Sequence, residues 1–157
     1  MNTECVRIAD QLRRAFHGEA WHGDSVGELL AGISTERASQ QPLVSAHTIW
    51  ELVLHIRAWV IAASDAVQGI PMPKLVGTDA DWPSIPEKTA AAWDRATDDL
   101  FRSAERLAVA IEGFDDGRLQ QTVPGRSYDF YHLLHGVVQH SLYHGGQIAL
   151  LKRGVTG

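Results

Sequence analysis

The sequence predicts an all-α protein: a four-helix bundle with a long crossover connection. Four stretches of the chain repeat apolar side chains every three or four residues, which is the period of an amphipathic helix. No segment alternates apolar and polar residues in the manner of a β-strand. The length of 157 residues, with 45% hydrophobic and 21% charged residues, suits one folded domain spanning residues 1–157.

The first helix is expected over residues 3–17, where the apolar side chains share one face. Residues 18–46 show a weaker pattern that is interrupted by glycines early and a proline late. Within them, Ser25 followed by Glu28 has the spacing of a helix cap, so one short helix can begin there. We therefore expect this region to be a long, partly structured excursion from the bundle.

Three further helices follow the same period. The second is expected over about residues 45–69 and the third over about 87–112. Between them, residues 69–86 contain four of the six prolines, so no helix can persist and the connection is long enough for a crossover. Residues 115–129 contain glycine and proline and predict another loop, which leads into a last helix over about 130–153.

Charge and composition exclude several classes of protein. The 14 basic and 19 acidic residues give a net charge of −5, and no basic run exceeds two residues, which argues against nucleic-acid binding. The longest apolar run, residues 58–63, is far shorter than the roughly 20 residues of a membrane helix. Without a secretory signal pattern, we expect a cytoplasmic protein that acts on a small molecule. The single cysteine, Cys5, falls on an apolar stripe and is predicted to be a core residue rather than a reactive thiol.

Three of the eight histidines lie where they can meet. His140 and His144 are four residues apart on the last helix, so their side chains project from one face, one turn apart. His55 occupies a comparable flank of the second helix. Three neutral imidazoles at a helix seam can bind one metal ion and leave positions open for water or substrate. The same pattern also fits surface histidines or buried imidazoles that are satisfied by hydrogen bonds.

Other polar and aromatic residues are candidates for supporting roles. Glu51 stands four residues after His47 and four before the second-helix histidine, so it can orient that ring or form an ordinary solvated pair. Gln147 can hydrogen-bond a ligand or a water molecule. Trp21 and His22 belong to the excursion and can either fold over the mouth of the bundle or serve as surface cover.

Two segments of the sequence resemble the DinB-like superfamily, also called the DinB/YfiT-like metalloenzymes. They are HTIWELVLHIRAW at residues 47–59 and LHGVVQHSLYHGGQI at residues 134–148. The stretches AWHG at 20–23 and DWP at 81–83 resemble one uncharacterised branch of that superfamily. The resemblance implies a four-helix bundle with a long second crossover. It also implies a metal triad with one histidine on the second helix and two on the last, which in this sequence are His55, His140 and His144.

The resemblance also implies a range of chemistry. The superfamily includes S-transferases that use low-molecular-weight thiols such as bacillithiol or mycothiol, and an isomerase that depends on mycothiol. We expect a divalent metal, zinc or nickel, that activates a thiol or water toward a small electrophile, as in a transferase or a hydrolase. The alternative is a non-catalytic bundle that binds metal or serves as a stress-linked binding module. An open metal position favours the enzyme, and a fourth protein ligand favours the structural site.

A homodimer is expected from the position of Trp50. This large aromatic lies on the side of the second helix away from His55, where the pattern provides it with no evident core partner. Bundles that resemble this one often pair through helix faces. The sequence therefore predicts that Trp50 helps to form a contact between two copies of the chain.

Overall fold

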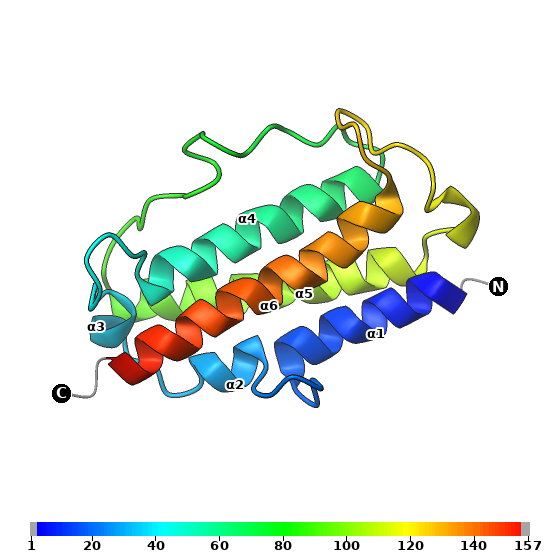
Figure 1. Cartoon of the computed structure of the whole chain (residues 1–157). Coiled ribbons are helices and arrows are strands. Elements are labelled where there is room, and N and C mark those ends of the chain that lie inside the picture. Colours follow the sequence, from blue (N-terminus) through cyan, green and yellow to red (C-terminus); the bar gives the residue numbers. More distant parts are fainter. Residues whose placement is uncertain (1–2, 155–157) are drawn as a thin grey trace.

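The computed structural model describes residues 3–154, and its secondary structure is helical, as the sequence predicts. Four long helices lie side by side along the length of the molecule (Figure 1). They are α1 (Thr3–His17), α4 (Ile49–Val67), α5 (Ala90–Glu112) and α6 (Phe130–Gly154). Within the described residues, β-pairing is limited to one isolated bridge in the connection before α6. None of the described helices is long and apolar enough to cross a membrane.

The four long helices form a closed ring of contacts around one apolar core. Helix α5 packs against α1 and α4, and α6 packs against the same two helices from the other side. Helices α4 and α5 run in the same direction, so residues 68–89 return along the full length of the bundle before α5 begins (Figure 1). The proline-rich stretch is therefore a crossover connection, which passes over α4.

The crossover connection is attached to the bundle by buried side chains and hydrogen bonds. Met72 and Leu75 are buried in the core, and the backbone N–H of Met72 donates to the carbonyl of Pro124 at 2.9 Å. Further along, Asp81 is buried against α4. These contacts hold the middle of the connection over α4, beside His55 and Trp59.

The excursion between α1 and α4 contains two short helices, α2 (Val26–Leu30) and α3 (Thr35–Ala38). Helix α2 begins with the predicted capping box, in which Ser25 and Glu28 each accept a hydrogen bond from the other's backbone N–H. Helix α3 was not predicted from the sequence, because it is one turn long and too short to show a period. Similarly, the loop before α6 contains a 3₁₀ turn, η1 (Asp116–Arg118), that has no periodic signal.

Two predicted helix starts were wrong by three or four residues, for the same reason. Helix α4 begins at Ile49 rather than near residue 45, because Thr48 caps it and forms a second capping box with Glu51. Helix α5 begins at Ala90 rather than near residue 87, because Thr89 caps it. In each case the threonine side chain accepts a backbone N–H of the first turn, which fixes the start of the helix.

The expected surface role of Trp50 is also wrong. Its side chain is 0% exposed, and its ring packs against that of Trp93 on α5 with the centroids 5.3 Å apart. The face of α4 away from His55 is therefore covered by α5 within the same chain. A dimer, if one forms, does not form through Trp50.

Candidate metal centre

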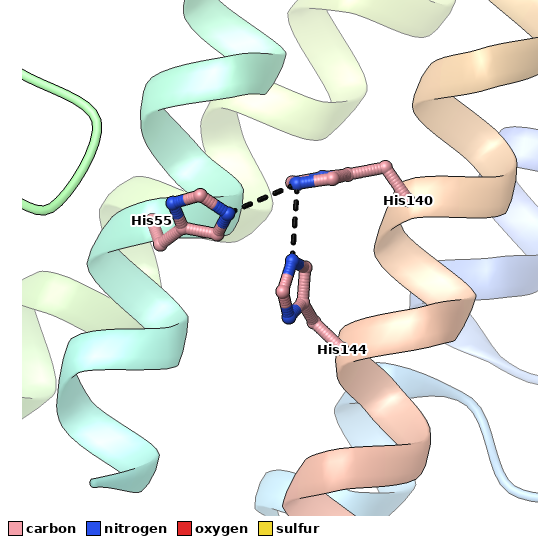
Figure 2. Close-up of side chains that lie close together, drawn as sticks. All are labelled: His55, His140 and His144. Atoms are coloured by element: carbon pink, nitrogen blue, oxygen red, sulfur yellow. Dashed lines mark hydrogen bonds between the residues drawn. The ribbon is translucent and has the colours of Figure 1, made fainter. Parts of the chain in front are cut away.

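The three predicted histidines come together between α4 and α6. The three rings form a triangle with their centroids 4.4–4.9 Å apart, and Nε2 of His140 is 3.0 Å from Nε2 of His55 and 3.1 Å from Nε2 of His144 (Figure 2). One ligand atom from each ring lies within 4.8 Å of the others. Helix α6 contributes two rings because its residues four apart share a face, and α4 contributes the third from across the seam.

Hydrogen bonds on the far side of two rings fix which nitrogen faces the centre. Nδ1 of His55 donates to the backbone carbonyl of Asp81 at 2.6 Å, and Nδ1 of His144 donates to Oε1 of Gln147 at 2.6 Å. Because each Nδ1 holds the proton of a neutral imidazole, each Nε2 presents a lone pair to the centre. These are the orientation and tautomer of metal-binding histidines supported by neighbouring acceptors.

The three neutral histidines do not have enough N–H hydrogens to form hydrogen bonds between all of their Nε2 atoms. Nε2 of His140 has one hydrogen at most in a neutral ring and faces two lone pairs, so it can donate to only one of them. Nδ1 of His140 is buried and has no hydrogen-bond partner among the described residues. Tetrahedral zinc ligands at about 2.0–2.1 Å from the ion are about 3.3 Å from one another, close to the observed spacing. The three rings therefore fit a metal ion.

Burial holds all three rings in the neutral form. Burial lowers the pKa of His55 and of His144 below the usual value for histidine. It lowers the pKa of His140 to about 3, with a further contribution from the two neighbouring rings. Neutral imidazole is the form that binds a metal, so at pH 7 the site is in its binding form.

Sequence reasoning missed the contribution of the crossover connection to this site. Beside its carbonyl, Asp81 places a carboxylate oxygen 3.2 Å from Nδ1 of His55, and the same oxygen accepts the indole N–H of Trp59 at 2.8 Å. Trp82 stacks on His55 with the ring centroids 3.8 Å apart. The sequence offers only a weak signal for these contacts, a DWP stretch within a proline-rich segment that periodicity cannot place.

The predicted supporting residues have different roles. Gln147 accepts a hydrogen bond from Nδ1 of His144 and so orients that ring. Metal-binding histidines are commonly held in this way, through the ring nitrogen that does not face the metal. Glu51 instead caps α4, and its carboxylate reaches Nδ1 of His47 only at 3.6 Å. The His47 ring stacks on Trp82 with the centroids 3.5 Å apart, so the indole lies between two imidazoles.

Trp21 and His22 do not lie over the three histidines. The Trp21 side chain is fully exposed, and both residues line a hollow beside α1 and the Val138–Leu142 side of α6.

The interpretation of Cys5 as a core residue agrees with the structure. Its side chain is 0% exposed, and burial, assisted by a hydrogen bond to Asp116, raises the pKa of the thiol to about 12. A thiol in that state does not act as a nucleophile at neutral pH.

Two cavities flank the histidine centre. One, of about 280 Å³, has the His140 ring in its wall and lies between α4 and α6. The other, of about 300 Å³, is bordered by His47 and Gln147 and includes none of the three rings. A larger hollow of about 610 Å³ lies along α4 and α5 among charged side chains such as Arg57 and Glu105, away from the three histidines.

Fold and site together define a helical protein with a three-histidine group that could hold a metal ion. Residues 20–148, which make up most of the chain, match the family model of the DinB superfamily. The chain therefore belongs to the DinB superfamily. None of the curated proteins and none of the solved structures gives a significant match.

Proposed function

We propose that this protein is a metal-dependent enzyme in which His55, His140 and His144 hold a divalent ion, zinc or nickel, that activates a thiol or water toward a small electrophile. The observation that carries the proposal is the convergence of three Nε2 atoms that do not have enough N–H hydrogens to form hydrogen bonds with one another. Imidazole nitrogen suits both metals.

A bound divalent ion would lower the pKa of a coordinated thiol or water and so supply a nucleophile at neutral pH. The chain's own residues hold and orient the three ligand nitrogens. Asp81 and Gln147 fix the tautomers, and Trp82 shields one face of His55 from solvent. Because the thiol of Cys5 is buried and protonated, an external thiol or water is the better nucleophile.

The three-histidine ligand set supports an enzyme over the alternative, a non-catalytic metal-binding module. Among residues 3–154, no fourth His, Cys, Asp or Glu joins the three histidines. A structural zinc site is normally closed by four protein ligands, whereas a catalytic site keeps a position for water or substrate. A cavity whose wall includes His140 lies beside the three rings and offers room for a substrate next to them.

The test compares turnover by the zinc- or nickel-loaded protein, the chelated protein and a His144→Ala variant. Each is assayed with a panel of low-molecular-weight thiols and small electrophiles. We expect turnover only with the loaded protein, and a matched His135→Ala variant should keep it, because His135 lies elsewhere on α6 beside Glu4. Equal turnover in the loaded, chelated and His144→Ala samples would contradict the proposal.

A further inference from the structure

The cavity beside His140 is lined mainly by aromatic, aliphatic and glycine residues, together with two histidines. Among residues 3–154, seven line it, and none of these is Lys, Arg, Asp or Glu. Trp59 closes the α4 side, while Leu133 and Val137 form part of the α6 side. A charged group placed there would lose water without gaining an ion pair.

Two of the polar side chains that line this cavity, Trp59 and Tyr128, are engaged within the chain. The single N–H of Trp59 donates to the Asp81 carboxylate at 2.8 Å, so the indole offers the cavity an apolar ring. The Tyr128 hydroxyl donates to the sulfur of Met72 at 3.5 Å. Nδ1 of His140 has no partner among the described residues but is buried, so the cavity wall offers mainly apolar contact. Polar recognition is then left to the centre formed by the three histidines.

A glycine forms part of the cavity wall. Gly136 lies one helical turn before His140 on α6, and apart from its own stretch of helix a Cβ atom added there would meet no atom of the described residues within 4 Å. The volume of about 280 Å³ exceeds the roughly 150 Å³ that can hold a benzene molecule. A group of one or two rings, or a branched aliphatic chain of that size, fits the space.

We propose that this cavity binds an uncharged aromatic or aliphatic group of the substrate, and that Gly136 sets the size of the group that fits. The inference rests on the proposed function, since the reacting atom of the same substrate would lie at the metal next to His140. The cavity bordered by His47 and Gln147 suits this role less well, because none of the three histidine rings forms its wall. Gln147, which is bonded to His144, is the lining residue that faces it instead. The hollow along α4 and α5 is lined by charged side chains and lies away from the centre.

The experiment measures binding of benzyl mercaptan, an uncharged aromatic thiol, to zinc-loaded protein by calorimetry. A Gly136→Leu variant fills the cavity, and Gly146→Leu is the matched control. Gly146 is also within α6, also has nothing within 4 Å of an added Cβ, and does not line the cavity. Leucine is preferred over glycine in a helix, so both variants should remain folded. The para-carboxylate derivative of benzyl mercaptan tests the charge preference.

We expect Gly136→Leu to weaken binding of benzyl mercaptan by about tenfold or more, while Gly146→Leu binds as the wild type does. The carboxylate derivative should bind the wild type about tenfold or more weakly than benzyl mercaptan. Zinc content, measured in every sample, separates this inference from the proposed function. Full zinc content with unchanged binding in Gly136→Leu, or equal binding of the two thiols, would overturn the cavity assignment alone. A wild type that holds no zinc would overturn both.

Discussion

At the scale of single residues, Asp81 connects the crossover connection to the histidine centre. Its backbone carbonyl accepts the proton of His55 Nδ1, and its carboxylate lies beside the same nitrogen while it accepts from Trp59. Asp81 is buried with its carboxylate 3.2 Å from Nδ1 of His55, which places its negative charge directly behind a histidine that would bind a divalent cation. A carboxylate behind a metal-binding histidine strengthens the histidine as a ligand and holds its ring in place.

Replacing Asp81 by Asn should therefore weaken zinc binding while the fold is retained. The backbone carbonyl remains in the variant, but the negative charge is lost, and changes of this type typically cost about 10–100-fold in metal affinity. Zinc titration against a competing chelator measures the change. Asp79→Asn is the control, because Asp79 is exposed two residues earlier and its substitution changes the net charge equally. Equal zinc affinity in the two variants would show that the Asp81 carboxylate does not support zinc binding.

The two packed tryptophans of the core allow a matched comparison of stability. The indole N–H of Trp93 donates to the carbonyl of Ile33 at 2.9 Å, whereas the buried N–H of Trp50 has no partner among the described residues. Phenylalanine removes a similar volume at both positions, but only Trp93→Phe breaks a hydrogen bond. We expect Trp93→Phe to cost about 1–2 kcal/mol more than Trp50→Phe in urea unfolding. Equal losses would show that the Trp93 hydrogen bond contributes nothing to stability.

At the scale of elements, an aspartate from η1 caps the start of α1. The Asp116 carboxylate accepts the backbone N–H groups of Glu4 and Cys5 at 3.0 and 2.9 Å. The first turn of α1 thus obtains acceptors from a segment more than a hundred residues away in sequence. The Cys5 thiol, together with these backbone groups, lowers the pKa of Asp116 to about 2.

The lowered pKa of Asp116 predicts how its contribution to stability depends on pH. The carboxyl group has an ordinary pKa of 3.8 in the unfolded chain and about 2 in the folded chain, so the unfolded chain binds more protons between these values. Its stabilising effect is complete above about pH 4 and is lost as the pH falls toward 2. Asp116→Asn should therefore be less stable than the wild type at pH 6, with a difference that shrinks as the pH falls from 4 to 2. Urea unfolding across that range measures it, and a difference that does not change with pH would contradict the assignment.

Hydrophobic period was sufficient to predict the four long helices, because each buries one face along its length. It was not sufficient for their ends, which Thr48 and Thr89 determine through hydrogen bonds to single N–H groups. Period also cannot detect α3, a helix of four residues that begins directly after its N-cap, Ser34. Local capping chemistry therefore accounts for most of the differences between the predicted and observed elements.

At the scale of the whole molecule, the path of residues 68–89 explains what the sequence could and could not predict about the site. His140 and His144 were predictable as a pair because their spacing alone places them on one face of α6. Asp81 and Trp82 were not, because their contacts with His55 depend on a crossover that returns along the bundle (Figure 1). Nothing in the spacing of a proline-rich connection indicates which of its residues will lie above a given turn of α4.

The homodimer remains a proposal that requires a surface other than Trp50. Large apolar side chains are exposed on α6 and in the loop before α2, among them Tyr143, Leu150 and Trp21. Their burial between two copies of the chain would remove apolar surface from water. Light scattering at micromolar concentration should report twice the chain mass of 17.3 kDa, and a particle of 17.3 kDa would overturn the proposal.

The most direct test of the central claim is a zinc titration of the purified protein, with a chromophoric chelator as competitor. The wild type should bind one zinc ion per chain. His140→Ala should lose that site and keep its helical circular dichroism, because Nε2 of His140 faces Nε2 of both other histidines while its ring lies outside the apolar core (Figure 2). If the folded His140→Ala variant bound zinc with the stoichiometry and affinity of the wild type, the three histidines would not be the metal site.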